Sequence, residues 1–188
     1  MAGLDPLSTT ISQVSESIRT RQLSPVELTR SCIEQAERLD PDLKAFTTLT
    51  SEYAIKRAQQ AEAEIMRGEY LGPLHGIPYT LKDVIATHGI RTTFGNPRKT
   101  DYQPKESATV HVLLEESGAV LLGKVYSHIG RGDNPVMCYS PWDPTTSPGT
   151  TSSGSGSAVA SGMGLLSIGT DTGGSVRHPA SNCGLVGF

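Results

Sequence analysis

The chain has 188 residues, with 16 lysines and arginines against 19 aspartates and glutamates, which leaves a formal net charge of −3 at neutral pH. This balance excludes a broad basic surface of the kind that binds nucleic acid. With 36% hydrophobic and 19% charged residues, the chain is too apolar to be disordered and long enough to bury a core. We therefore expect a folded globular protein.

The cysteines and the N-terminus indicate the cellular compartment in which the protein is expected. Cys32, Cys138 and Cys183 are odd in number and lack C-x-x-C spacing, so neither a disulfide framework nor a zinc site is expected. The N-terminus has no basic region followed by an apolar run, and no apolar stretch approaches the length of about 18 residues that a membrane span needs. We expect a cytoplasmic protein that binds no membrane, no metal and no cofactor.

The first part of the chain has helical patterns. Residues 11–18 carry apolar side chains at i, i+3 and i+7, which is typical of one helix face. A second helix is predicted to begin at Ser24, an N-cap serine followed by Pro25, and to end at Asp40-Pro41. A third is predicted over about residues 51–67.

From residue 71 onward, short apolar runs alternate with helical patterns. Strands are predicted at residues 77–81, 119–123 and 165–168, and helices at residues 107–117 and 158–162. This alternation is typical of an α/β sheet. We assign residues 1–70 to an N-terminal helical section and residues 71–188 to the core of the same domain.

Residues 145–157 (TTSPGTTSSGSGS) contain no charge and consist of serine, threonine, glycine and proline. That composition is typical of a flexible linker. The segment that follows is too short to fold alone, however, so a backbone-rich active-site loop is the alternative interpretation. The spacing of Gly149 and Gly154 matches a phosphate-binding loop, but Ser155 stands where that motif requires lysine, and we exclude it.

Residues 169–177 (GTDTGGSVR) follow a predicted strand and place Ser175 directly after two glycines. Glycines let the backbone turn sharply and bring consecutive N–H groups toward one point, which is what a tetrahedral oxyanion requires. A serine at such a turn is a candidate nucleophile. On spacing alone, a glycine-rich turn with a solvated serine is the favoured explanation of the pattern. Asp171 and Arg177 flank the turn with opposite charges and are predicted to form a buried pair that braces it.

Three motifs therefore follow one another along the chain: GPLHGIPYTLKD at residues 72–83, SPGTTSSGSGS at residues 147–157 and GTDTGGSVRHPA at residues 169–180. In this order they resemble the amidase signature family, and the ending CGLVGF at residues 183–188 fits as well. The resemblance runs from about residue 10 to the end of the chain. It implies an α/β/α core with a mixed sheet, preceded by N-terminal helices.

The resemblance also implies the chemistry. Members of the family cleave amides or transfer amide nitrogen with a Ser–cis-Ser–Lys triad. By this resemblance Ser175 is the nucleophile and Lys82 the base, and Ser175 with Thr172, Gly173 and Gly174 supplies the oxyanion-hole amides. Because a free lysine has a pKa near 10.4, Lys82 must be buried or near positive dipoles to act as a base at neutral pH. A surface pair of Lys82 with Asp83 is the alternative.

The relay hydroxyl between base and nucleophile is the position where the chain departs from the family pattern. An ungapped count from Ser175 places the relay at Thr151, and Thr150-Thr151 stands where the family has Gly-Ser. Threonine keeps the hydroxyl, but its methyl group crowds the cis peptide that the resemblance implies. We prefer Thr151, with Ser152 as the alternative after a shift of one residue.

The resemblance predicts a hydrolase that cleaves a non-peptide amide bond of a small molecule through an acyl-enzyme on Ser175. Two alternatives stay open: the A subunit of a glutamyl-tRNA amidotransferase, and a truncated, non-catalytic remnant. Amidase signature proteins continue well beyond this length, so the chain corresponds to their N-terminal part. The incomplete sheet that results predicts self-association, because an exposed apolar sheet edge recruits other chains.

Overall fold

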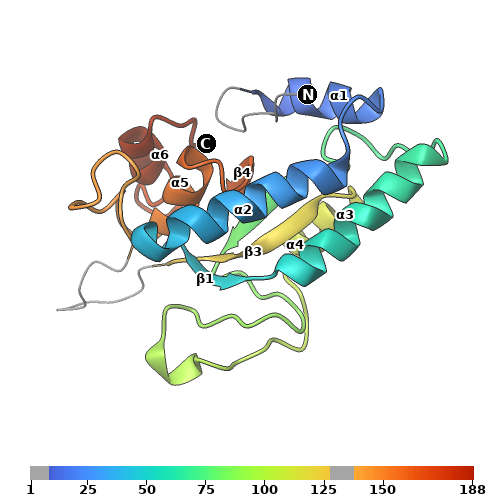
Figure 1. The fold of residues 1–188 in the computed structure, drawn as a ribbon. Helices are drawn as coiled ribbons and strands as arrows, with labels where there is room; N and C mark the ends of the chain where they lie inside the picture. The colour runs from blue at the N-terminus through green and yellow to red at the C-terminus, as the bar shows by residue number, and fades with distance from the viewer. Residues whose placement is uncertain (1–8, 128–137) are drawn as a thin grey trace.

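A four-stranded mixed sheet lies at the centre of the computed structural model, which describes residues 9–127 and 138–188 (Figure 1). The strands follow the order β1-β3-β2-β4. Strand β3 (Val120–Val125) pairs antiparallel with β1 (Phe46–Leu49) and parallel with β2 (Pro78–Lys82), which also pairs parallel with β4 (Leu166–Ile168). The α/β class and mixed sheet predicted from the sequence are confirmed.

Helices cover both faces of this sheet. They are α1 (Ile11–Arg19), α2 (Pro25–Leu43), α3 (Ser51–Met66), α4 (Thr109–Glu116), α5 (Ser153–Ala160) and α6 (Arg177–Cys183), with a short 3-10 helix η1 (Pro97–Lys99). On one face, α2 and α3 pack side by side against Val120 and Leu122 of β3 (Figure 1). On the other face, Leu114 of α4 packs against Tyr79 and Leu121. None of the helices within the described ranges has the length and hydropathy needed to cross a membrane.

Helix α2 continues past its expected end at Asp40-Pro41, so that boundary was wrong. Its C-cap is Lys44, which has a left-handed φ of 52° and donates its N–H to the carbonyl of Asp40. The Asp40 carboxylate accepts hydrogen bonds from the N–H groups of Ala45 (2.7 Å) and Phe46 (2.9 Å). Pro41 lies close enough to the end that little of the helix is lost by its missing N–H. The hydrogen bonds of the Asp40 side chain thus stabilise the turn between α2 and β1.

Strand β1 was missed in the section that we expected to be wholly helical. It has four half-buried residues, too few for an alternating pattern to stand out. Among the strands of the described residues it lies at the edge of the sheet and pairs with β3. Its place in the sheet is therefore decided by pairing across about 75 residues of sequence, and not by local preference.

A register shift between β2 and β3 decides which way two lysines face. Tyr79 pairs with Leu121 but Thr80 pairs with Gly123, so Leu122 is the extra residue of a bulge. Beyond it, Leu81 pairs with Lys124 and Lys82 with Val125. Since successive residues of a strand point to opposite faces, Lys82 and Lys124 lie on opposite faces of the sheet.

Helix α5 begins inside the serine- and glycine-rich stretch, so the linker interpretation was wrong for residues 153–157. Its glycines allow contacts that no larger residue permits. A Cβ at Gly154 would lie 2.4 Å from the backbone nitrogen of Tyr126 and 2.6 Å from the carbonyl oxygen of Ala45. A Cβ at Gly156 would lie 3.0 Å from Cβ of Pro179. The glycines therefore bring α5 against the end of β3 and against α6.

We predict that Gly154→Ala destabilises the fold by about 1–3 kcal/mol, because the added methyl group must displace backbone atoms and not a flexible side chain. Urea-induced unfolding measures the change. Gly173→Ala is the matched control, since a Cβ there meets nothing within 4 Å. Equal unfolding midpoints for the two variants would contradict the close approach at Gly154.

Candidate active site

Lys82 ends strand β2 and is 2% exposed. Its Nζ donates hydrogen bonds to Oγ1 of Thr170 (2.7 Å) and Oγ1 of Thr151 (3.1 Å). These partners lie 88 and 69 residues further along the chain. The structure thus brings the three motifs together at one amine, and Lys82 does not form a surface pair with Asp83.

The electrostatic surroundings of Lys82 favour its neutral form. Burial lowers the pKa of this amine to about 8, and the charge of Asp171 opposes part of the shift. Both of its partners among residues 9–127 and 138–188 are uncharged hydroxyl groups, so no carboxylate of these residues touches the amine and holds it protonated. Lys82 consequently loses its proton at a lower pH than an ordinary lysine does.

Thr170 is the functional residue that the sequence analysis missed. It immediately precedes Asp171 in the third motif. Its hydroxyl accepts the shorter of the two hydrogen bonds that Lys82 donates. A neutral amine has two N–H groups and one lone pair. If one N–H is directed to Thr170, the lone pair is free to accept a proton from Thr151.

The two relay candidates have different partners. Thr151 contacts Lys82, whereas the Oγ of Ser152 donates to the carbonyl of Thr170 (3.3 Å) and accepts from its N–H (3.4 Å). No peptide bond in the described residues is cis, so the cis peptide that we expected is not found there. Thr151 itself has a left-handed φ of 56°. The contacts favour Thr151 over Ser152 as the neighbour of the base.

The turn that carries Ser175 is organised by Asp171. Its carboxylate accepts hydrogen bonds from the N–H groups of Gly174 (2.6 Å), Val176 (3.0 Å) and Arg177 (3.3 Å). The Arg177 guanidinium and these amides hold the pKa of Asp171 well below its usual range. The ionised carboxylate caps the start of α6 and leaves Ser175 half-buried, without a hydrogen-bond partner for its Oγ in the described part of the chain.

Two expectations about this turn need correction. The Asp171–Arg177 pair forms (3.1 Å), but the arginine side chain is 64% exposed against 21% for the aspartate, so the pair is not buried. The amide of Gly174 is occupied by Asp171 and is not open to a substrate in this structure. Over residues 9–127 and 138–188, the amides of Thr172, Gly173 and Ser175 have no partner. These three amides remain the candidate oxyanion donors.

Gly174 cannot be replaced without moving the turn. It has a φ of 110°, a conformation that residues with a Cβ rarely adopt. A Cβ there would also lie 2.8 Å from the imidazole ring of His178. The glycine before the serine is therefore required by backbone geometry, as the motif indicated.

A groove of about 930 Å³ starts beside this turn, at Ser152, Gly169 and Val176. It runs between β4, α5 and α6, and its walls are mainly apolar. Among the described residues, no group of three or more histidine, cysteine, aspartate or glutamate side chains is placed to hold a metal ion.

Residues 27–188 match the profile of the family described as Amidase. The chain belongs to the amidase signature family. Among curated relatives of this family, the putative amidase AmiD of Mycobacterium tuberculosis is 41% identical over 182 residues, which are 95% of this chain and 38% of the relative. The A subunit of the glutamyl-tRNA(Gln) amidotransferase of Trichodesmium erythraeum is 41% identical over 184 residues, with the same coverage of 95% and 38%.

Solved structures of amidase signature enzymes have the same fold. A peptide amidase from Stenotrophomonas maltophilia superposes with a TM-score of 0.86 at 30% identity, over 92% of this chain and 38% of that one. A bacterial aryl acylamidase gives a TM-score of 0.84 at 30% identity, over 94% and 38%. The chain thus spans less than half the length of the relatives that it matches.

The burial of Lys82 predicts a pH dependence of stability. Its pKa is about 8 in the folded protein against an ordinary value of 10.5, so between these pH values the unfolded chain binds more protons. The free energy of unfolding should therefore rise with pH across this range, and Lys82→Met should remove part of the rise. Denaturant unfolding at pH 7.5–10 measures it.

Lys56→Met, which removes an exposed lysine from α3, is the control for this measurement. It should leave the slope of stability against pH unchanged. The same slope in wild type and Lys82→Met would show that Lys82 titrates as an ordinary solvated lysine.

Proposed function

We propose that this protein is an amide hydrolase that forms an acyl-enzyme on Ser175. The observation that carries the proposal is the hydrogen bond between the buried amine of Lys82 and the hydroxyl of Thr151. Membership of a family whose relatives are named amidases supports it. The substrate class is a small molecule with a non-peptide amide bond.

In this mechanism neutral Lys82 takes a proton from the Thr151 hydroxyl, which in turn takes the proton of Ser175. The Oγ of Ser175 forms a bond to the carbonyl carbon, and the negative charge moves onto the carbonyl oxygen. The amides of Thr172, Gly173 and Ser175 are the donors that we propose for that oxygen, and each such donor is worth roughly 10²–10³ in rate.

The intermediate collapses when the carbon–nitrogen bond breaks. The proton held on Lys82 returns through Thr151 to the departing nitrogen, so the amine leaves neutral. Water then attacks the ester carbon on Ser175, with Thr151 and Lys82 again removing a proton. The bond between this carbon and Oγ of Ser175 breaks, the proton returns through Thr151 to Oγ, and the carboxylic acid is released. No cofactor takes part in either half of the reaction.

A fluorophosphonate probe, which reacts covalently with activated serines, tests the nucleophile. Wild type should label at a rate that rises with pH through about 8, as Lys82 loses its proton. Ser175→Ala should not label. Labelling of Ser175→Ala at the wild-type rate would overturn the assignment, and a folded wild type that does not label would favour the non-catalytic remnant.

The relay is tested by three variants. Thr151→Val keeps the shape of the side chain but removes its hydroxyl, and we expect a loss of labelling rate of at least about 100-fold. Thr151→Ser should retain most of the rate, and Ser152→Ala should change it little. The reverse ranking, with Ser152→Ala more severe than Thr151→Val, would transfer the relay to Ser152.

A second candidate is the A subunit of a glutamyl-tRNA amidotransferase, favoured by the 41% identity to a protein of that name. Such a protein would release ammonia from glutamine only together with partner subunits. Glutaminase activity that requires added partner subunits and charged tRNA would support it. Amide hydrolysis by the purified protein alone would exclude it.

We also propose that the protein self-associates and works in the cytoplasm. Within the described residues strand β4 pairs with β2 alone, and beside it the apolar groove is flanked by the exposed side chains of Val186 and Phe188. Apolar surface of this kind favours association. The three cysteines are free thiols, which suits a reducing compartment. A monodisperse 20 kDa species in light scattering would contradict self-association.

A further inference from the structure

His75, in the first of the three motifs, is a completely buried histidine that takes no part in the proposed reaction. Its Nδ1 accepts a hydrogen bond from the backbone N–H of Leu71 (3.1 Å), and its Nε2 lies 2.8 Å from a carboxylate oxygen of Glu64. A ring nitrogen that accepts a hydrogen bond carries no proton, so the single proton of the neutral ring is on Nε2 and is donated to Glu64. The neutral ring therefore satisfies both of its nitrogens.

The protonated ring does not fit the same contacts. Protonation of His75 puts a second N–H on the ring at Nδ1, and this donor faces the N–H of Leu71, which is also a donor. The hydrogen bond from Leu71 is then lost, and two donors are left unpaired at a side chain that water does not reach. Opening of the turn that contains both residues relieves this conflict.

The hydrogen bond from Leu71 to His75 closes the turn of residues 67–77, which connects α3 to β2. Near the end of this turn, the N–H of Gly76 donates to the carbonyl of Gly118 (2.9 Å), two residues before β3. A Cβ at Gly118 would overlap the imidazole ring of His75. The ring thus fills the space between the start of β2 and the start of β3.

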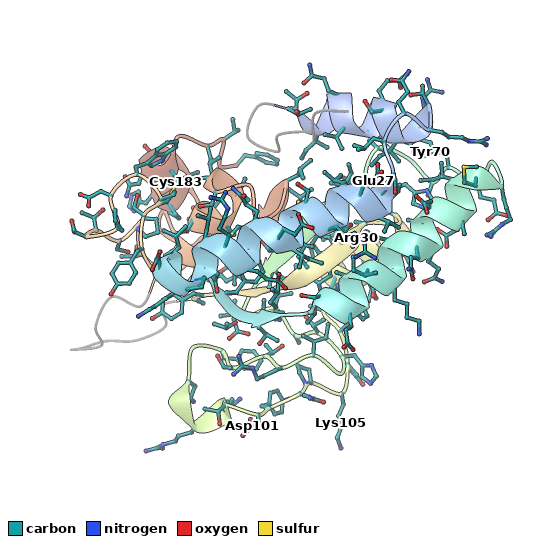
Figure 2. All side chains as sticks on the ribbon, viewed as in Figure 1. Glu27, Arg30, Tyr70, Asp101, Lys105 and Cys183 are labelled. Atoms are coloured by element: carbon teal, nitrogen blue, oxygen red, sulfur yellow. The ribbon has the colours of Figure 1, made fainter. Side chains whose placement is uncertain are left out.

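Tyr70 connects the same turn to α1, and it is the titratable side chain of the turn that faces the imidazole ring. The two rings are stacked, with their centroids 5.9 Å apart. The hydroxyl of Tyr70 lies 2.8 Å from Oγ of Ser15 in α1. Figure 2 shows Tyr70 beside α1 and close to the C-terminal end of α3. The turn that His75 closes is therefore the junction of α1, α3 and β2.

The charged groups near the ring come from α3 and α4. On α3, Glu64 contacts both His75 and the guanidinium of Arg57 (3.4 Å). On α4, the carboxylate of Glu115 is directed to His111 (3.5 Å). Burial lowers the pKa of His75 below its ordinary value of 6.5, the hydrogen bond and charge of Glu64 oppose this shift, and the charge of Arg57 adds to it. The folded protein therefore favours the neutral ring.

We propose that His75 is a pH-sensitive switch at the junction of α1, α3 and β2: the neutral ring holds the turn of residues 67–77 closed, and protonation of the ring opens it. Strand β2 carries Lys82 at its other end, so the switch acts on the strand that bears the proposed base. The switch itself does not depend on whether the protein hydrolyses an amide.

The sign of the effect follows from the two states of the turn. In the open turn the ring is solvated and has the ordinary pKa of 6.5, whereas in the closed turn its pKa is lower. Below about pH 6.5 the open turn therefore binds more protons, and the closed turn loses stability as the pH falls. Above this pH the closed turn has its full stability.

Hydrogen exchange followed by mass spectrometry measures the opening in peptides that cover residues 67–77. After correction for intrinsic exchange, protection in wild type should fall by on the order of tenfold between pH 7 and pH 5. His75→Asn should show no such fall, because the asparagine Oδ1 can accept the hydrogen bond from Leu71 and does not titrate. His88→Asn, which removes an exposed histidine, is the control and should behave as wild type.

Unchanged protection in wild type between these pH values, or a fall that persists in His75→Asn, would overturn the proposal. Glu64→Gln is a second variant that leaves His75 in place. It keeps an acceptor for the Nε2 proton but removes the charge that favours the protonated ring. Its fall in protection should be larger than that of wild type, and a smaller fall would also overturn the proposal.

If His75→Asn does not fold, the comparison of Glu64→Gln with wild type decides the question, since the histidine and its turn remain in both proteins. Fluorophosphonate labelling at pH 7 is a separate readout. Wild type that shows the pH-dependent opening but does not label would overturn the amidase proposal and leave the switch standing.

Discussion

The candidate site depends on the burial of one amine among hydroxyl groups. Lys82 lies at the end of β2 with Thr151 and Thr170 as its partners. An amine removed from water needs polar partners, and neutral partners do not hold it in its charged form. The same contacts therefore join three distant segments of chain and shift Lys82 toward the base that an amide hydrolase needs.

Small residues make this arrangement possible. The contacts at Gly154 place the start of α5, and with it Thr151, against the end of β3. Gly156 brings α6 against α5. Because α6 begins two residues after Ser175, the spacing of the two helices also sets where this candidate nucleophile lies. A stretch that has the composition of a flexible linker is in fact buried, with close backbone contacts at Gly154.

The sheet carries a buried lysine on each face, and the two are kept apart by the bulge at Leu122. Lys82 is directed toward the serine- and threonine-bearing segments, and Lys124 toward the loop after β2. Asp83 and Asp171 each supply a negative charge near one of them. At the end of β2, the charges of these side chains, the register of the strands and the hydrogen bonds of the following loop are consequently found together.

The sequence by itself determined the helix and strand alternation, the family, and Lys82 and Ser175 as the residues to examine. Helical periodicity, N-caps and glycine turns are local, so residues 11–18, Ser24 and Gly174 could be interpreted without a fold. Other features were decided only by the tertiary structure. They are strand β1, the continuation of α2 past Pro41, the start of α5 within a glycine-rich stretch, and the contacts of Thr170 and Lys124. Each depends on hydrogen bonds or close approach between segments far apart in the chain, and a shift of one residue in the register of β2 and β3 would turn either lysine to the other face.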